Sequence, residues 1–330
     1  MPANLTPQYQ KAEEAFRRAQ TAQERLDCLE LMLQIIPKHK GTEKLQADIK
    51  SRLKDTRAEQ QAEKSAPKSV GKHYRFPRQG AGQILIIGGP NSGKSRVLKE
   101  LTKAEPEIAD YPFTTREPLP GMMAWEDIAV QLIDTPPITD SHFETYLLNL
   151  VRTADLVLLV FDGRSDDAPE ATVAVTAQLA QRHTLLSDHT GFDEEDFSNV
   201  HVTTRLVVTH AADADWSTRV DFLRESQPIP YPVAPVELDD AASREALRGE
   251  IIAALQIIRV YTKTPGKPAE YASPFTLPEG GTVEDLAGKV HRDLAEKVRS
   301  AKVWPFGSSD SRTVGKDHVL SDKDLAELQT

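Results

Sequence analysis

A short apolar run that leads straight into a glycine-rich loop constrains the fold of this chain more than any other feature of its sequence. The run ILII (residues 84–87) is followed by GGPNSGKS (residues 88–95), and a helix-favouring stretch, VLKELT, comes next. Strand, loop and helix in this order match the full phosphate-binding loop pattern. Backbone N–H groups of such a loop surround a phosphate, so the sequence predicts an α/β domain built around a nucleotide site.

The residue types in and after this loop each have an expected task. Lys94 is expected to reach the β- and γ-phosphates and to act in catalysis, and the Ser95 hydroxyl is expected to bind Mg²⁺. Asp134 ends the run IAVQLID, where a carboxylate would hold Mg²⁺ directly or through water; capping a turn is its alternative role. The residues expected to contact the nucleotide are Gly88, Gly89, Pro90, Asn91, Ser92, Gly93, Lys94 and Ser95.

The apolar runs after the loop predict a mainly parallel sheet. Strand-like runs occur at residues 128–134, 156–162 and 205–210, and spans long enough for helices separate them. This rhythm is typical of βαβ units with helices on both faces of the sheet. We therefore expect three regions: a helical hairpin with a linker over residues 1–72, the nucleotide domain over 73–258, and a small α+β domain over 259–330.

The two outer regions carry local patterns of their own. Leu45, Ile49 and Leu53 recur at helical spacing and are expected to pack together. In the last region we expect a strand at PFTLPEGG, one amphipathic helix from about Thr282 to Lys297, and a final strand pair through DHVLSD.

The overall composition narrows the environment and the class of partner. A formal net charge of −10 argues against a general basic surface that wraps nucleic acid, although a local patch remains compatible with it. The single cysteine, Cys28, can form no internal disulfide and suits a reducing compartment. The sequence holds no apolar span of bilayer length and no secretory signal, so we expect a cytoplasmic protein without membrane contact.

Several stretches resemble one family. DYPFTT (residues 110–115) resembles the switch I signature of Obg-type GTPases, and IPKHKGTEKLQADIKSRL resembles the N-terminal helical region of the developmentally regulated GTP-binding proteins. RVYTKTPGKP, GGTVEDLAGKVHRDL and VGKDHVLSD resemble, in order, their C-terminal TGS domain. The resemblance covers nearly the whole chain. It implies a P-loop NTPase fold of the Ras-like G-domain type, followed by a small ubiquitin-like TGS domain.

The resemblance also implies ligands and partners. GTP or GDP with Mg²⁺ would be the cofactors. Thr115 would bind Mg²⁺ and sense the γ-phosphate, with Thr114 as second choice, so that Ser95, Thr115 and Asp134 surround the metal. TGS domains are associated with translation factors, so contact with the ribosome or RNA is implied, and the N-terminal helices could hold a protein partner. One set of residues in this domain could form a basic helix face that binds RNA, or a face that is simply exposed to solvent. They are Lys289, His291, Arg292, Lys297 and Arg299.

The chain departs from the family at its second switch. The family's Asp-x-x-Gly is replaced by Asp134-Thr135-Pro136-Pro137. The glycine N–H bonds the γ-phosphate in GTPases, and proline has no N–H. A hydrogen bond to a charged group contributes about 1.5–3 kcal/mol, so the distinction between GTP- and GDP-bound states should weaken. Ile138 stands where many GTPases carry a glutamine, which resembles members with slow turnover; His142 is a candidate base or an ordinary surface histidine.

The chain departs from the family again where the base is recognised. Asn-Lys-x-Asp aligns to His210-Ala211-Ala212-Asp213. Asp213 is expected to accept from guanine N1–H and its exocyclic amine, with helix capping as its alternative role. His210, which replaces an amide, is also expected to contact the nucleotide. Ala211 lacks the stem that a lysine lays over the base, so guanine preference should be weaker. The family's backbone contact to the guanine oxygen would fall near Ala234-Pro235-Val236.

Three functions remain open on the sequence alone. The first is a GTP-binding protein that hydrolyses GTP slowly with Mg²⁺ and acts in ribosome- or translation-related regulation. The second is a nucleotide-binding scaffold with little or no hydrolysis, which acts through protein or RNA contacts. The third is a P-loop ATPase. Intact Lys94 and Ser95 favour the first function, and Pro137 and Ala211 favour the second.

Overall fold

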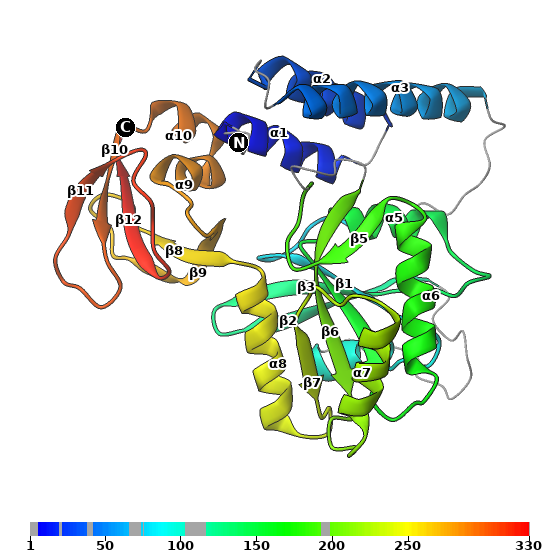
Figure 1. Ribbon diagram of the computed structural model, residues 1–330. Coiled ribbons are helices and arrows are strands. Elements are labelled where there is room, and N and C mark those ends of the chain that lie inside the picture. Colours follow the sequence, from blue (N-terminus) through cyan, green and yellow to red (C-terminus); the bar gives the residue numbers. More distant parts are fainter. Residues whose placement is uncertain are drawn as a thin grey trace.

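The computed structural model describes residues 6–19, 22–37, 42–65, 74, 76–102, 117–192 and 199–329. Within these residues, the middle of the chain forms a large sheet with helices on both sides. The three N-terminal helices lie over one end of this sheet, and the smaller C-terminal sheet lies to its side (Figure 1). None of the described helices is long and apolar enough to span a membrane.

The large sheet confirms the predicted parallel arrangement. Its order is β2-β3-β1-β4-β6-β5, with β7 also paired to β6, and every pairing except that of β2 with β3 is parallel. The three strand-like runs all form strands, and β6 begins earlier than the run that predicted it. The strands are β1 (Gln83–Ile87), β2 (Leu119–Trp125), β3 (Ile128–Asp134), β4 (Leu156–Asp162), β5 (Thr184–Ser187), β6 (Val200–Thr209) and β7 (Val233–Val236).

Helices cover both faces of this sheet, which explains why its central strands are apolar at almost every position. All five residues of β1 are buried, and alternate side chains enter opposite cores: Leu85 and Ile87 face one, Ile84 and Ile86 the other. The first core is completed by α5 (Thr145–Thr153), α6 (Ala168–Ala180) and α7 (Trp216–Ser226), and the second by α4 (Lys94–Leu101) and α8 (Ala241–Ala254).

The N-terminal region holds a third helix beyond the predicted hairpin. α2 (Ala22–Ile35) and α3 (Glu43–Ser65) form the hairpin, and α1 (Pro7–Arg18) packs on it. The two-helix prediction was therefore incomplete, because α1 buries Tyr9, Ala12 and Phe16 in the same small core. The predicted packing positions Leu45, Ile49 and Leu53 are all buried in that core, which confirms them.

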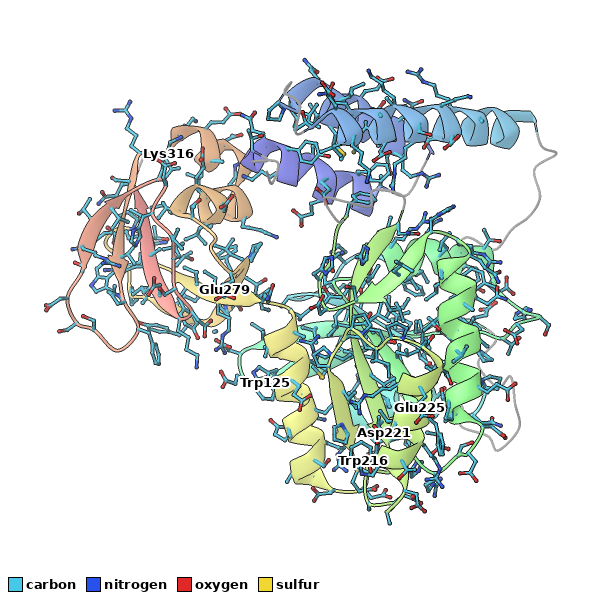
Figure 2. All side chains as sticks on the ribbon, in the orientation of Figure 1. Trp125, Trp216, Asp221, Glu225, Glu279 and Lys316 are labelled. Atoms are coloured by element: carbon cyan, nitrogen blue, oxygen red, sulfur yellow. The ribbon has the colours of Figure 1, made fainter. Side chains whose placement is uncertain are left out.

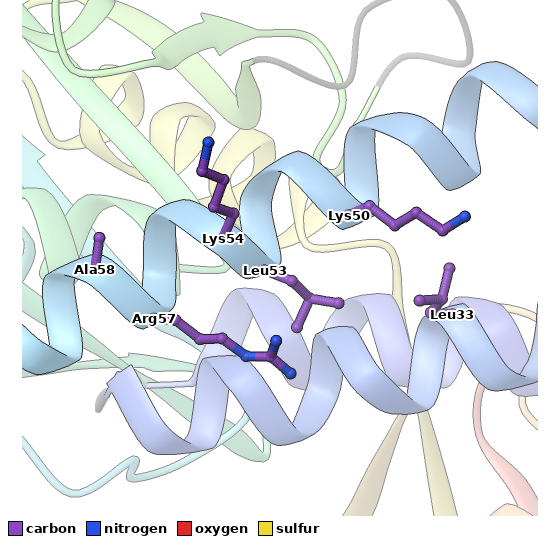
Figure 3. Close-up of a pocket in the computed structure, with 6 residues that line it drawn as sticks. All are labelled: Leu33, Lys50, Leu53, Lys54, Arg57 and Ala58. Carbon is purple, nitrogen blue, oxygen red and sulfur yellow. The ribbon is translucent and has the colours of Figure 1, made fainter.

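Phe192, after β5, joins the helices to the sheet domain. Its backbone N–H donates to Glu13 of α1 at 3.2 Å, its ring centre lies 5.9 Å from that of Phe16, and the Arg52 guanidinium of α3 lies 4.2 Å above it. A hollow of about 600 Å³ opens elsewhere on these helices (Figure 3). It holds none of the residues predicted to bind a nucleotide, and its lining consists of Leu33, Lys50, Leu53, Lys54, Arg57 and Ala58.

The C-terminal sheet has the order β11-β10-β12-β8-β9 and packs against two short helices. Two predictions here were wrong in detail. The expected single helix breaks at His291, whose extended backbone (φ −163°, ψ 138°) ends one helix and caps the next. DHVLSD is the loop before the last strand, anchored by a bridge between Val319 and Thr282. The elements are β8 (Ile257–Thr262), β9 (Glu270–Pro278), α9 (Val283–Val290), α10 (Arg292–Lys297), β10 (Ser300–Trp304), β11 (Arg312–Gly315) and β12 (Asp324–Gln329).

The hairpin of β2 and β3 joins the two sheets. Arg259 of β8 donates to Asp127 at the hairpin tip at 2.9 Å and to Asp322 of its own sheet at 2.8 Å, and it also pairs with Glu126. These carboxylates, Asp322 foremost, raise the pKa of Arg259, which is only 12% exposed. Trp125 lies beside α8 at the base of the same turn (Figure 2). The hairpin is thus held by both sheets.

Candidate functional site

The polar residues predicted from the sequence gather at one edge of the large sheet. The glycine-rich loop follows β1, Asp134 ends β3, Asp162 ends β4, and His210 follows β6. These strands are parallel, so their carboxyl ends meet at the same edge, which is where open α/β sheets bind ligands.

The loop leads into α4 with a backbone that only small residues tolerate. Gly93, directly before α4, has φ +94°, a left-handed value that disfavours side chains. A Cβ at Gly88 would lie 2.7 Å from the Ser92 hydroxyl and 2.8 Å from the Val160 carbonyl oxygen, so no larger residue fits there. No side-chain hydrogen bond caps the N-terminus of α4, which begins directly after the loop. The helix dipole and the N–H groups of the first turn favour an anion at this point.

Lys94 is buried inside the loop. Its Nζ donates to the carbonyl oxygen of Gly89 at 2.7 Å and to that of Gly88 at 3.2 Å. Burial lowers the pKa of Lys94 to about 8, and the charge of Asp134 opposes this shift. The ammonium is therefore near the loop's centre and holds its charge less firmly than an exposed lysine.

Ser95 and Asp134 lie together, although 39 positions separate them in the sequence. The Ser95 hydroxyl donates to Asp134 Oδ2 at 2.5 Å, and the Asp134 side chain is fully buried. Hydroxyl and carboxylate oxygens are the ligands that Mg²⁺ prefers, so this pair fits the metal that the fold family implies. In the part of the chain that the structure describes, no group of three or more His, Cys, Asp or Glu side chains offers another metal site. Thr115 and Thr114 lie outside the described residues.

The segment after Asp134 lies against the loop and is buried. The Ile138 N–H donates to the Gly88 carbonyl oxygen at 3.2 Å, and the Thr135 hydroxyl donates to Ile86 at 2.8 Å. Pro137 lies between these two anchors, and Ile138 is a core residue with no exposed surface. His142 lies on the surface, with Nε2 3.5 Å from a Glu144 oxygen.

The two residues predicted to recognise the base, His210 and Asp213, form hydrogen bonds with protein groups that were not predicted from the sequence. Asp213 accepts from Arg219 of α7 at 2.9 Å and from the Asp215 backbone at 2.9 Å. These two contacts lower the pKa of Asp213, the backbone bond foremost. His210 has φ +55° and lies between Asp162 and Arg96.

The residues near which a backbone contact to the base was expected, Ala234-Pro235-Val236, lie in a strand. These residues form β7 itself, with Ala234 and Val236 buried and paired to β6. The segment that follows the strand is Glu237-Leu238-Asp239, and Asp239 pairs with Arg96 at 2.5 Å. Asp162 ends an apolar strand, and this sequence signal could have identified it as a partner of His210.

Comparison with known proteins agrees with this arrangement. Residues 83–190 match the family described as 50S ribosome-binding GTPase, and residues 258–330 match the TGS domain. An uncharacterised GTP-binding protein of Halobacterium salinarum is 24% identical over 93% of this chain and 98% of its own length. Developmentally-regulated GTP-binding protein 1 of Xenopus laevis is 25% identical over 78% of this chain and 85% of its own.

A solved structure supports the fold. The YchF GTPase of Schizosaccharomyces pombe superposes with a TM-score of 0.53 over 78% of this chain and all of its own, at 12% identity. Both domain matches follow the order in which the two sheets occur along the chain. The chain therefore has a P-loop GTPase domain followed by a TGS domain, and it is similar over most of its length to developmentally regulated GTP-binding proteins.

Proposed function

We propose that this protein binds GTP and GDP with Mg²⁺ and hydrolyses GTP slowly. The observation that carries the proposal is the Ser95–Asp134 contact of 2.5 Å beside the uncapped N-terminus of α4. A phosphate chain laid along the loop would meet the α4 N–H groups and the Lys94 ammonium together. Such fixed, oriented donors are the main source of catalysis in phosphoryl transfer.

Each loop residue has a task in this proposal. The backbone from Gly88 to Gly93 would surround the β-phosphate, and Lys94 would pair with the β- and γ-phosphates. Ser95 and Asp134 would hold Mg²⁺, with Thr115 as the third ligand that the family resemblance implies. When bound, Mg²⁺ would neutralise charge on the phosphates.

Slow turnover follows from the segment after Asp134. Pro137 offers no N–H to a γ-phosphate, and the next N–H, that of Ile138, donates to Gly88 at 3.2 Å. Ile138 is buried in the core, so it orients no attacking water. Positioning by phosphate contacts alone would leave hydrolysis slow.

The TGS domain would supply the contact with the ribosome or RNA. The description of the matched GTPase family, and the presence of a TGS domain, support this part of the proposal. On the helix face considered above, Lys289, His291, Lys297 and Arg299 are exposed, and α10 also exposes Asp293 and Glu296. Because acidic residues alternate with basic ones, this face favours a local contact over broad electrostatic binding.

A scaffold without hydrolysis is the second candidate, and Pro137 favours it specifically. In that case GTP and GDP would bind equally and the protein would act through its helices and TGS domain. The two candidates differ in one measurable quantity, the release of phosphate from bound GTP.

Single-turnover phosphate release, followed for hours with Mg²⁺ or with a chelator, tests the proposal. We expect slow release that requires Mg²⁺ and falls at least about tenfold in Asp134→Asn. Asp140→Asn, on the exposed turn that follows, is the matched control and should leave the rate unchanged. Equal affinity for GDP and a GTP analogue without release would favour the scaffold instead.

A further inference from the structure

His210, which stands where the family has a base-contacting asparagine, belongs to a continuous chain of hydrogen-bonded polar groups. His210 Nδ1 lies 2.9 Å from Asp162 Oδ1, and its Nε2 lies 3.2 Å from Arg96 Nη1. Arg96 continues to Asp239 at 2.5 Å. The chain Asp162–His210–Arg96–Asp239 therefore links the ends of β4 and β6, the first turn of α4 and the segment after β7.

The chemistry of the partners settles the direction of these bonds. A guanidinium only donates, so His210 Nε2 accepts from Arg96. The proton of the neutral ring must then be on Nδ1, which donates to Asp162. Both ring nitrogens are thereby engaged, and the His210 side chain is only 14% exposed. It has no remaining polar atom with which to contact a base.

Asp213, the one residue that keeps its family identity here, is engaged as well. Arg219 Nη1 and the Asp215 N–H both donate to the same oxygen, Oδ1, at 2.9 Å each. Arg219 is itself fixed, because it donates to the Gly163 carbonyl oxygen and to Asp166, each at 2.7 Å. Its side chain is 15% exposed.

Reading of guanine by a carboxylate needs both of its oxygens. Guanine presents two parallel donors, N1–H and the exocyclic amine, which a carboxylate accepts as a pair. In Asp213, Oδ1 already accepts two bonds, so this pairing would require Arg219 or the turn to give way. The lysine stem that would cover the base is also missing, since position 211 is alanine.

We infer that this protein recognises nucleotides by their phosphates and binds guanine and adenine nucleotides with similar affinity. Arg219 removes the discrimination between bases because it holds Asp213. The inference rests on the proposed nucleotide site, and it specifies the substrate class of that site as purine nucleoside di- and triphosphates. Arg219 is a specificity-determining residue that acts through Asp213.

Calorimetric titration with Mg²⁺ and GDP, IDP, ADP or tripolyphosphate tests the inference on the whole chain. For the wild type, we expect the affinities for GDP, IDP and ADP to agree within about threefold, because both ring nitrogens of His210 and Oδ1 of Asp213 are already bonded to protein groups. IDP lacks the exocyclic amine, so the GDP-to-IDP ratio reports on Asp213 without any substitution. A preference for GDP of more than about tenfold over ADP or IDP overturns the inference.

Arg219→Met keeps the aliphatic stem and removes the guanidinium bond to Asp213 Oδ1, while the Asp215 N–H bond stays. We expect it to raise the GDP-to-ADP affinity ratio by about tenfold and to leave tripolyphosphate binding unchanged. Arg224→Met is the matched control: it lies on the same helix, pairs with Asp221 on the surface at 2.8 Å, and should leave the ratio unchanged. An unchanged ratio in a folded Arg219→Met protein contradicts the role of Arg219.

The ligand set separates this inference from the proposed function. If tripolyphosphate and all nucleotides fail to bind, the nucleotide site itself is wrong. If tripolyphosphate binds and GDP binds far more tightly than ADP, the site is right and only the inference fails. If Arg219→Met does not fold, the wild-type GDP, IDP and ADP affinities still decide the question.

Discussion

The two ends of the proposed nucleotide site differ in the partners that their polar groups bind. At the phosphate end, the α4 N–H groups have no side-chain cap, and Lys94 donates to two loop carbonyls and to the Ser92 hydroxyl, which a phosphate can replace. At the base end, His210 and Asp213 are bound to charged side chains that are themselves anchored. One end is open to a ligand, and the other is satisfied within the protein.

This difference separates the two tasks that we propose for the site, phosphate binding and base reading. Phosphate binding depends mainly on backbone geometry, which glycine positions such as Gly93 preserve. Base reading depends on the identity of a few side chains, and substitutions there leave the fold intact. Loss of base selectivity therefore need not reduce phosphate affinity, and the following predictions test that separation.

The largest effect is expected for Lys94→Ala. Removing the buried ammonium should lower the affinity for Mg²⁺-GDP and Mg²⁺-ADP alike, by about a hundredfold, because two charge-assisted phosphate contacts are lost. Titration calorimetry measures both affinities. Lys99→Ala, an exposed lysine of the same helix, is the control. A loss confined to GDP would break the comparison.

Pro137→Gly should have the next largest effect. The new N–H can reach a γ-phosphate, so affinity for a non-hydrolysable GTP analogue should rise about tenfold relative to GDP. Pro136→Gly adds the same backbone freedom one residue earlier and should not change this ratio. Competition binding measures both variants, and an equal response of the two would indicate a general loosening of the segment.

Raising the pH should weaken phosphate binding through Lys94. Because its pKa is about 8, Lys94 is almost fully charged about one pH unit below that value and loses its charge as the pH rises through it. Because phosphate binds the charged form, the affinity for Mg²⁺-ADP should be constant below pH 7 and about tenfold lower at pH 9. ADP is suitable because adenine does not lose a proton in this range. A flat profile in the wild type would contradict the proposed Lys94 contact.

The smallest effect is expected for Ala211→Lys. Restoring the lysine of the family pattern alone should change the GDP-to-ADP ratio by less than about threefold, because Asp213 stays with Arg219. In the Arg219→Met background the same substitution should add to the guanine preference. A double-mutant cycle measures this dependence. Independent effects in the two backgrounds would show that Arg219 does not control the base end.

The sequence alone determined the phosphate end of the site and the parallel sheet behind it. The strand, loop and helix around Gly88–Ser95 are adjacent in the chain, so local pattern was enough to predict them. The spacing of apolar runs predicted β3, β4 and β6, and the position of Asp134 followed from the order of strands in a βαβ domain. The roles of these residues toward a nucleotide remain predictions.

Tertiary structure alone decided which groups occupy the base end and how the two sheets are joined. Arg96 and Arg219 come from two separate helices, and nothing in their local sequence indicates that they bond His210 and Asp213. The pairing of Arg259 with Asp127 likewise joins residues 132 positions apart. Such contacts depend on the relative placement of packed elements, whereas sequence patterns report only on which elements form and which face they bury.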